Sequence, residues 1–406
     1  MPDLQTPKLL MHILFLSRWY PFPPNNGSKL RVFHLLRALA AQHSVTLLSF
    51  REAQEEVDTD APEIRDLCHE IHPVPWPKFN PTSGTSIAGL LSPKPRSVLD
   101  SHSPEMADKI QQLIAENQFD VIIASQVGTA GYGRYFQNIP ALFEEVEMGI
   151  YHEQLAQADS FKSRLRYQLT LTKQTNYLRE LLQYFETCTV VSEPEQRLVK
   201  TAVPGYQNVE IIPNCMNLID YDQVRVAKRP NSLIFTGSFT YHVNHQAMEW
   251  YVREVNPLVQ AQIPDVQLSI TGDHANLPLP PASNVTLTGF VDDIRSWIAS
   301  SCISLAPIFM GGGTRLKILE AMALRTPVVA TSKGAEGLDV EHGKHLLLAD
   351  TPQAFAEAVV NLLHDPNLYH QIAENGYQLI AEKYDWPSVT PHFLHLVERT
   401  AQAKNV

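Results

Sequence analysis

The sequence contains little cysteine, no long apolar run and no excess of basic residues. Its 406 residues include only four cysteines, Cys68, Cys188, Cys215 and Cys302, which lie far apart and form no C-x-x-C pair. This pattern fits a reducing compartment and excludes a disulfide framework and a cysteine-based zinc site. The formal net charge is −11, which argues against nucleic acid as a partner because nucleic-acid-binding proteins usually carry a basic face.

The chain also lacks the features of exported and membrane-spanning proteins. Its N-terminus has no basic segment followed by an apolar one, and no run approaches ~18 apolar residues. With 44% hydrophobic and 18% charged residues, the composition is that of an ordinary globular protein. We therefore expect a soluble, cytoplasmic protein, and the length favours two domains over one.

What the chain does contain is two series of short apolar segments separated by helical stretches. Such continuous apolar strands are typical of parallel sheets covered by helices on both faces. The first series comprises 12–17, 44–50, 120–125, 141–145 and 188–192, and the second comprises 232–237, 266–272, 285–289, 302–308, 327–332 and 345–350. The predicted fold class is α/β, with two doubly wound domains. Because ligands bind beyond the carboxyl ends of such strands, we expect a site in a cleft between the domains.

The segment GGGTRLKILEAMA at 311–323 raises a question of charge. From Leu316 its apolar residues recur with helical spacing, and Arg315 and Lys317 fall at the start of that helix. Cations are unfavourable at the positive end of a helix unless an anion lies beside them. Glycines leave backbone N–H groups open to a phosphate. The segment therefore predicts an anion site, with a solvated glycine loop as the alternative.

Two common phosphate-binding motifs are absent. The glycine-rich segment does not follow the order of a Walker P-loop, and neither domain offers G-x-G-x-x-G at its first strand–helix turn. Near the N-terminus, a proline-rich turn is followed by Gly27 and Ser28 at a helix start. Each domain is therefore expected to contribute a helix N-terminus to the site.

No metal site is expected. Asp292 and Asp293 follow a strand of the second series, but we expect them to cap a helix beginning near Ile294. The 16 histidines are scattered, and His242 and His245 have no third ligand nearby in the sequence.

Several of these segments closely resemble the C-terminal domain of the group 1, or family four, glycosyltransferases. They are FTGSFTYHVNHQAMEWYV, ITG, GFVDDIRSWIASSCISLAPIFMGGGTRLKILEAMALRTPVVAT and GAEGL, all within about 230–350. A looser resemblance extends to PPNNGSKLR, EEVEMGIY and EIIPNCMN in the N-terminal half, and to KYDWPSV near the C-terminus. The resemblance implies the GT-B fold, with an acceptor-side domain at 1–215, a donor domain at 216–385 and a C-terminal helix at 386–406 that crosses back.

The resemblance also implies a reaction. The protein would be a retaining hexosyltransferase acting in glycan or exopolysaccharide assembly. It would use a nucleotide-diphosphate sugar of the UDP or GDP type, without a cofactor or metal. Its acceptor would be a glycan, a lipid-linked molecule or a small molecule.

The donor-site residues follow from matching positions. Glu320 matches the second Glu of the family motif E-x7-E, which holds the ribose hydroxyls, whereas the first Glu is replaced by Gly312. Arg315 and Lys317 substitute for an Arg and a Lys that many members carry after the first strand of the second domain, and we assign them catalytic roles. The expected donor-binding residues are Gly27, Ser28, Gly237, Phe290, Val291, Gly311, Gly312, Gly313, Thr314, Leu316 and Glu320.

The acceptor side is less defined. A histidine that commonly ends the fourth N-terminal strand is replaced by Ser125 and Gln126. The acceptor-side candidates are Arg31, Glu144 and Glu147, with Glu145 considered beside them, and a solvated strand end is the alternative.

Two segments are candidates for peripheral contact with the inner face of a membrane. The proline-rich segment 73–104 is an acceptor-contact loop, a membrane-contact loop or an ordinary surface loop without such a role. The basic, amphipathic helix at 161–185 either lies on anionic lipid or packs against the rest of the protein with one face exposed to solvent. Two other functions stay open. One is a non-catalytic sugar-nucleotide-binding subunit, which the missing Glu and His favour. The other is a GT-B sugar-nucleotide epimerase, which would need acid/base carboxylates and histidines around the sugar, and Gly312 removes one candidate.

Overall fold

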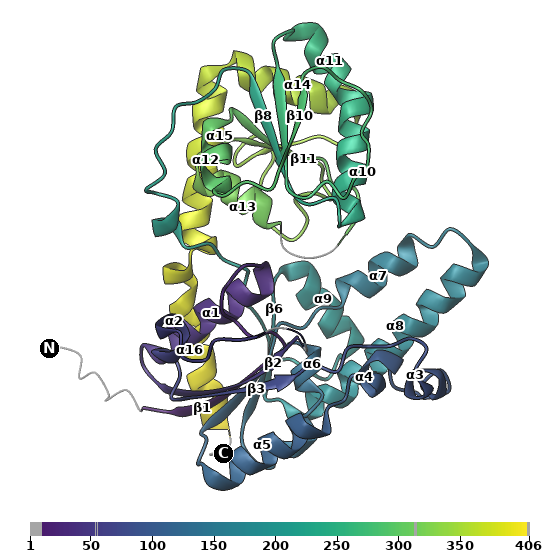
Figure 1. Ribbon diagram of the computed structural model, residues 1–406, viewed down its shortest axis with the longest axis vertical. Helices are drawn as coiled ribbons and strands as arrows, with labels where there is room; N and C mark the ends of the chain where they lie inside the picture. Colours follow the sequence, from purple (N-terminus) through teal and green to yellow (C-terminus); the bar gives the residue numbers. More distant parts are fainter. Residues whose placement is uncertain (1–9, 53, 55, 312–314, 404–406) are drawn as a thin grey trace, which may run out of the picture. The chain divides into compact units, whose positions relative to one another are not determined.

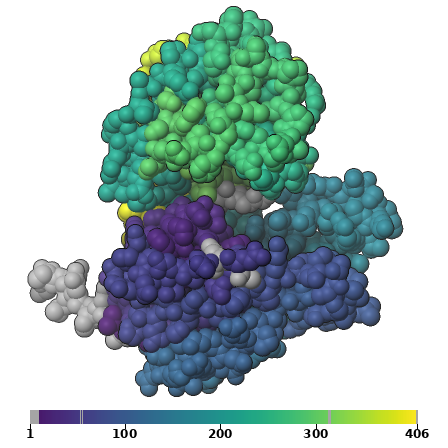
Figure 2. All heavy atoms as spheres, viewed as in Figure 1, coloured from purple at the N-terminus to yellow at the C-terminus, as the bar shows by residue number. Residues whose placement is uncertain are grey.

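The computed structural model describes residues 10–52, 54, 56–311 and 315–403, and the chain divides into two compact units (Figure 1). Unit 1 contains the residues up to Pro213 and those from Thr390 onward, and unit 2 is Asn214–Val389. From the sequence, boundaries were expected after residues 215 and 385. Figure 2 shows the packed surfaces, with unit 1 mostly in purple and blue and unit 2 mostly in greens.

Unit 1 is built on a seven-stranded parallel sheet in the order β3-β2-β1-β4-β5-β6-β7. The strands are β1 (His12–Ser17), β2 (Ser44–Arg51), β3 (Glu70–Pro75), β4 (Val121–Ser125), β5 (Ala141–Glu144), β6 (Thr187–Val190) and β7 (Val209–Ile211). Five of these were predicted within one or two residues, whereas β3 and β7 were not. The interior strands are buried along almost their whole length because helices cover both faces.

The helices of unit 1 include a long α8 that packs with α5 and α9 on one face of the sheet. They are α1 (Gly27–Ala40), α2 (Pro62–Arg65), α3 (Gly84–Ala88), α4 (Arg96–Asp100), α5 (Pro104–Glu116), α6 (Val127–Ala130), α7 (Gly149–Ala156), α8 (Phe161–Leu181) and α9 (Glu193–Ala202). Short 3₁₀ turns lie at Gly133–Tyr135 and Leu182–Tyr184. Helix α1 begins as expected, because the Asn26 side chain accepts a hydrogen bond from Lys29 N. The predicted helix at 161–185 is α8, and its first three turns are largely exposed.

Unit 2 is built on a six-stranded parallel sheet in the order β10-β9-β8-β11-β12-β13. The strands are β8 (Ser232–Thr236), β9 (Gln267–Thr271), β10 (Val285–Gly289), β11 (Ile303–Ala306), β12 (Val328–Ala330) and β13 (Leu347–Leu348). All six were predicted, but β10 was expected to be buried on both faces. Because it lies at the sheet edge, Thr286 and Leu287 are exposed.

Helices cover both faces of this second sheet (Figure 1). One core contains α10 (His242–Trp250), α11 (Asn256–Gln262) and α14 (Pro352–His364), and the other contains α13 (Leu316–Ala323) and residues of α12 (Ile294–Ser300) and α15 (Pro366–Leu379). Single π-helical turns at Tyr251–Val255 and Ile380–Tyr384 join neighbouring helices, and a 3₁₀ turn lies at Leu218–Asp220. The last helix, α16 (Trp386–Gln402), begins in unit 2. Its final turns belong to unit 1, where Arg399 pairs with Glu210 of β7.

In both units the strand order reverses in the same place. The reversal lies between β1 and β4 in unit 1 and between β8 and β11 in unit 2. This is the strand order of the Rossmann fold, which confirms the α/β prediction of two doubly wound domains. In open α/β sheets, ligands bind beyond the carboxyl ends of the strands at this reversal, so both places are candidate sites. None of the helices that the structure describes has the length and apolar character needed to cross a membrane.

Candidate functional site

The carboxyl ends of β8 and β9 in unit 2 are packed closely enough to require glycine. A Cβ atom on Gly272 would lie 2.9 Å from the backbone nitrogen of Ser238, and one on Gly237 would lie 2.7 Å from Asn244 Nδ2. Both glycines have positive φ angles, +109° and +151°. The glycines therefore allow the Asn244 side chain and the Gly237–Ser238 backbone to pack directly against these strand ends.

Lys317 lies in the first turn of α13, beside this glycine-lined edge. Its Nζ atom donates a hydrogen bond to Asn244 Oδ1 at 3.0 Å and lies 3.9 Å from the centroid of the Phe235 ring. Asn244 Nδ2 in turn donates to the Ser238 carbonyl at 2.8 Å. Burial lowers the pKa of Lys317 to about 7, with a further decrease from Arg315 and an opposing effect of Glu320. The ammonium is thus held in place, and its charge depends on whether an anion lies beside it.

Arg315 is the N-cap residue of α13 and is only 8% exposed. Its Nη2 donates to the carbonyl oxygens of Gly311 at 2.6 Å and Lys333 at 3.1 Å. The guanidinium therefore joins Gly311 to the segment that follows β12. This differs from the sequence expectation of a cation turned toward a phosphate.

Glu320 lies one turn beyond Lys317, and its surroundings are more polar than the spacing suggested. Tyr221 Oη donates to Glu320 Oε1 at 3.3 Å. Burial raises the pKa of Glu320, while this hydrogen bond and Lys317 oppose the increase. Lys317 itself donates to Asn244 rather than to Glu320. The carboxylate is therefore not simply the i, i+3 salt-bridge partner of Lys317.

The other expected donor-site residues belong to several elements of the two units. Phe290 is 87% exposed and Val291 is half-buried, directly after the end of β10. Leu316 opens α13 and is half-buried. Gly27 and Ser28 open α1 in unit 1. Gly312, Gly313 and Thr314 lie outside the described residues.

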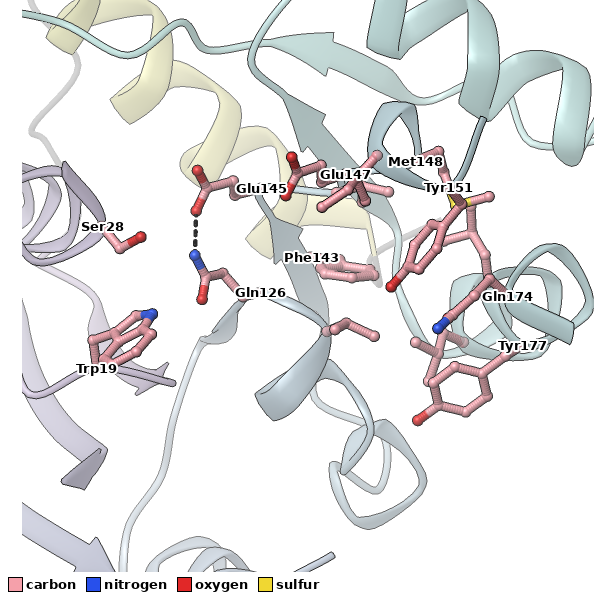
Figure 3. A pocket seen from close by; sticks show the side chains of 15 residues that line it. Trp19, Ser28, Gln126, Phe143, Glu145, Glu147, Met148, Tyr151, Gln174 and Tyr177 are labelled. Carbon is pink, nitrogen blue, oxygen red and sulfur yellow. Dashed lines mark hydrogen bonds between the residues drawn. The ribbon is translucent and has the colours of Figure 1, made fainter. Parts of the chain in front are cut away.

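Unit 1 has a cavity of about 290 Å³ at its own strand-order reversal (Figure 3). Ser28 and Trp19 lie at one end in this view, and Tyr151, Gln174 and Tyr177 lie at the other. Gln126, Glu145 and Glu147 line the cavity as well. Trp19 could have been suspected from sequence because it follows a predicted strand, whereas Gln174 and Tyr177 are α8 residues with no such signal.

Gln126 and Glu145 face each other in this cavity (Figure 3). Gln126 Nε2 donates to Glu145 Oε2 at 2.8 Å. Their backbone φ angles are +68° and +61°, which non-glycine residues rarely adopt. Such strain costs about 1–3 kcal/mol per residue and is concentrated at functional sites. Burial raises the pKa of Glu145 to about 7; Arg31 opposes the shift and Glu144 adds to it. A carboxyl group that titrates near neutral pH therefore faces the cavity.

Arg31 and Glu144, two of the acceptor-side candidates, form an internal ion pair. Arg31 Nη2 lies 2.6 Å from Glu144 Oε1, and the two side chains are 1% and 0% exposed. Ser125 Oγ donates to the other carboxylate oxygen at 2.7 Å. Arg31 also donates to the carbonyls of Ile212 and Pro213. This pair holds strand ends together and offers no surface to an acceptor, which differs from the expected contact.

Glu147, the third candidate, lies on the cavity wall. Burial raises its pKa, and the nearby Glu195 adds to the increase. The cavity is therefore lined by Glu145 and Glu147, and not by Glu144.

Two Asp-x-Asp sequences bear on the expectation that no metal is bound. In the first, Asp58 Oδ1 accepts hydrogen bonds from the backbone of Asp60 and Ala61. In the second, Asp222 accepts from Tyr377 Oη, and Asp220 accepts from Asn217. The carboxylates of both sequences thus accept hydrogen bonds within their own unit. The predicted cap is confirmed, because Asp293 accepts from Arg295 N at the start of α12.

Comparison with known proteins finds a family model that matches part of unit 2. Residues 230–365 match the family model described as Glycosyl transferases group 1. This part of the chain is therefore similar to the group 1 glycosyltransferases. It contains the strand-end glycines, Lys317, Glu320 and the whole of α13.

Curated relatives match parts of the chain. An uncharacterized 44.6 kDa protein in the cps region of Klebsiella pneumoniae is 29% identical over 165 residues, which is 38% of this chain and 42% of the relative. A phosphatidyl-myo-inositol mannosyltransferase of Mycobacterium leprae is 28% identical over 208 residues, covering 49% and 53%. The chain thus spans about half the length of these relatives, or less.

Solved structures match almost the whole chain. Anabaena HepE in complex with UDP and glucose has a TM-score of 0.62 at 16% identity, covering 96% of this chain and all of that one. Sucrose-phosphate synthase from Thermosynechococcus elongatus has a TM-score of 0.67 at 19% identity, covering 96% and 98%. At these identities the likeness concerns the fold, which is GT-B with its two Rossmann-like domains.

Proposed function

We propose that the protein transfers a hexosyl residue from a nucleoside diphosphate sugar to a hydroxyl group of a glycan acceptor, with retention and without a metal ion. The observation that carries the proposal is the placement of Lys317 and Glu320 on α13, beyond the glycine-lined end of β8, within the part that matches the family model. The structures of Anabaena HepE that resemble this chain hold UDP or UDP-glucose, which favours a uridine donor.

The chemistry needs positive charge at the leaving group. As the anomeric bond breaks, negative charge grows on the departing diphosphate. Lys317 and the N-terminal N–H groups of α13 supply donors to it without a metal. A single preorganised donor of this kind is worth about 2.7–4 kcal/mol in the transition state. Arg315 contributes by holding the glycine-rich loop through Gly311 and Lys333, and Glu320 accepts from the ribose hydroxyls.

On the acceptor side, Glu145 is the residue that we assign to the reacting hydroxyl. Its carboxyl group faces the cavity of unit 1, is held by Gln126 and titrates near neutral pH. A carboxylate at this position accepts a hydrogen bond from a sugar hydroxyl and so orients it for attack. The relatives named for a cps region and for lipopolysaccharide core biosynthesis, the latter from Rhizobium meliloti, support a role in glycan or exopolysaccharide assembly.

A lipid-linked acceptor would bring the protein to a membrane surface. The first turns of α8 support such contact, because exposed Phe161, Leu165 and Leu169 alternate with Lys162 and Arg164. Sedimentation with vesicles of anionic and neutral lipid tests this part of the proposal. Binding to anionic vesicles that Phe161→Ala weakens would support it, and equal recovery in the supernatant with both lipids would contradict it.

A panel of UDP- and GDP-hexoses tests the donor. The correct donor should raise the Tm, since a ligand that binds the folded state stabilises it, and should be consumed when glycosides are added. Donor binding without hydrolysis or transfer would instead favour a binding subunit for a partner transferase. Conversion of the donor to its epimer would favour the epimerase.

A further inference from the structure

A second cavity, of about 210 Å³, adjoins the first in unit 1. Gln126, Val127 and Tyr177 line both cavities, so the two share a wall. The second cavity extends from this shared wall toward Trp76 and His102. Glu145 does not line the second cavity, and the proposed reaction gives this cavity no role.

The second cavity has aromatic walls with polar groups between them. Tyr132 and His102 are stacked, with ring centroids 5.1 Å apart and an interplanar angle of 21°. Trp76 stands edge-on to the buried Phe50 at 4.7 Å. Ser97 and Ser101 also line the cavity, and the Ser101 hydroxyl donates to the Ser97 carbonyl at 2.7 Å.

Arg18 fixes the aromatic walls of both cavities. Its guanidinium carbon lies 4.1 Å from the ring centroid of Trp19, which lines the first cavity, and 3.9 Å from that of Trp76, which lines the second. Arg18 Nη2 also pairs with Glu52 at 2.9 Å. Because its charge is neutralised by Glu52 and its faces are covered by rings, Arg18 orders the walls and does not call for an anionic ligand.

Glycines keep the cavity open. A Cβ atom on Gly128 would lie 3.3 Å from Arg18 Cδ and 3.4 Å from Trp76 Cη2, and one on Gly131 would lie 2.8 Å from Tyr177 Oη. Both positions border the second cavity, so side chains there would fill it or displace its walls.

This lining matches one class of ligand. A sugar ring has an apolar C–H face that packs on an aromatic ring and a rim of hydroxyls that needs donors and acceptors. Each cavity is smaller than the ~300–1,000 Å³ of typical small-molecule sites, which suits one ring in each. We propose that the second cavity binds the sugar residue next to the one that is glycosylated. The acceptor is then a glycan of at least two residues. This inference rests on the proposed function.

The test compares acceptors of two lengths. Methyl glycosides of glucose, galactose and mannose are assayed beside the corresponding disaccharide glycosides, with Trp76→Ala, His102→Ala and the wild type. We expect both variants to raise the KM for disaccharides about tenfold, the effect of one lost aromatic contact, and to change the KM for monosaccharides less than twofold. His102 lies on the exposed rim, so its replacement does not endanger folding. Tyr184→Ala, which replaces an exposed aromatic residue outside both cavities, is the matched control.

The outcomes separate this inference from the proposed function. An equal loss with both acceptor lengths, or no loss with either, overturns the second subsite. A third outcome is a lower KM for octyl glycosides than for methyl glycosides, lost in Trp76→Ala, with no preference for disaccharides. This result would assign the second cavity to an alkyl chain and would also overturn the second sugar subsite. If the wild type turns over no donor, the proposed function fails. In that case, saturation-transfer NMR of the disaccharides still tests whether the second cavity binds a sugar. Signals on the second sugar residue that are present with the wild type and lost with Trp76→Ala support the subsite, and equal signals with both proteins overturn it.

Discussion

Lys317 of α13 and Asn244 of α10 are joined by a hydrogen bond of 3.0 Å at the glycine-lined end of β8. The bond fixes the ammonium where two helices meet, with the Phe235 ring beneath it. Burial and Arg315 lower the pKa of Lys317 to about 7, so the free protein loses this charge as the pH rises above neutrality. A bound diphosphate would restore the charge, because an opposite charge favours the ionised form.

Donor binding should therefore take up protons through Lys317. Since binding raises a pKa that is about 7 in the free protein, affinity for a UDP-sugar should be highest below pH 7 and fall as the pH rises above it. A UDP-sugar has no terminal phosphate that titrates in this range. Calorimetry at pH 7.5 in two buffers of different ionisation enthalpy measures the uptake. The Lys317→Met variant should bind the UDP-sugar more weakly and take up no proton on binding. An unchanged proton uptake in this variant would exclude Lys317 as the group that titrates.

Glu320 should recognise the ribose. Glu320→Gln keeps the shape but removes the charge, and charge-assisted hydrogen bonds are worth about 1.5–3 kcal/mol, so UDP binding should weaken at least ~10-fold. A 2′- or 3′-deoxy donor should show a similar loss with the wild type and little further loss with Glu320→Gln. Calorimetry over this cycle gives the coupling energy. Additive losses would mean that Glu320 does not contact the ribose.

The Arg31–Glu144 pair should contribute to stability rather than to acceptor binding. Removing one partner of a buried ion pair leaves an uncompensated charge, so Glu144→Ala should lower the free energy of unfolding by about 3–5 kcal/mol. The double variant Arg31→Met/Glu144→Leu should lose less than Glu144→Ala. The exposed pair Arg197–Glu193, with side chains 67% and 76% exposed, is the control, and Glu193→Ala should cost about 0–1 kcal/mol. Urea denaturation measures all three. A loss for Glu144→Ala no larger than the control loss would refute the buried-pair account.

Glu145 should make stability depend on pH. Its pKa is raised from 4.5 to about 7 in the folded protein, so the wild type is most stable below the unfolded pKa and loses stability as the pH rises through about 7. Glu145→Gln cannot ionise and escapes this loss. Its Tm should therefore exceed that of the wild type at pH 8 by at least ~2 °C, the shift from about 1 kcal/mol in a domain of this size, with a smaller difference at pH 5. A difference independent of pH would show that ionisation of Glu145 is not the cause.

Most of the fold could be predicted from the sequence because the inner strands are continuous apolar runs. The missed strands have weak signals for physical reasons. Strand β3 contains Pro73 and Pro75, which cannot donate hydrogen bonds to a neighbouring strand. Strand β7 has only three residues, with Glu210 in the middle. Both lie at the edges of the sheet, where continuous burial is not required.

The site could be predicted only in part. Arg315 and Lys317 are both cations at the start of α13, and nothing local distinguishes them. Arg315 turns inward because the carbonyls of Gly311 and Lys333 lie beside it, and Lys317 meets a residue 73 positions away. The Gln126–Glu145 pair was equally hidden, because positive φ angles at non-glycine residues are imposed by tertiary packing. Such contacts leave no periodic pattern in the sequence.

Transfer with and without Lys317 is the most direct test of the central claim, that α13 binds the donor diphosphate for metal-independent transfer. Release of the nucleoside diphosphate is measured in the presence of EDTA. The substrates are a glycan acceptor and the donor that the panel of UDP- and GDP-hexoses identifies. We compare the wild type with Lys317→Ala and with Lys344→Ala, whose lysine is exposed in unit 2. The account predicts transfer unaffected by EDTA, reduced about 100-fold or more in Lys317→Ala, and unchanged in Lys344→Ala. Transfer abolished by EDTA and restored by Mg²⁺, or an unaltered rate in Lys317→Ala, would contradict it.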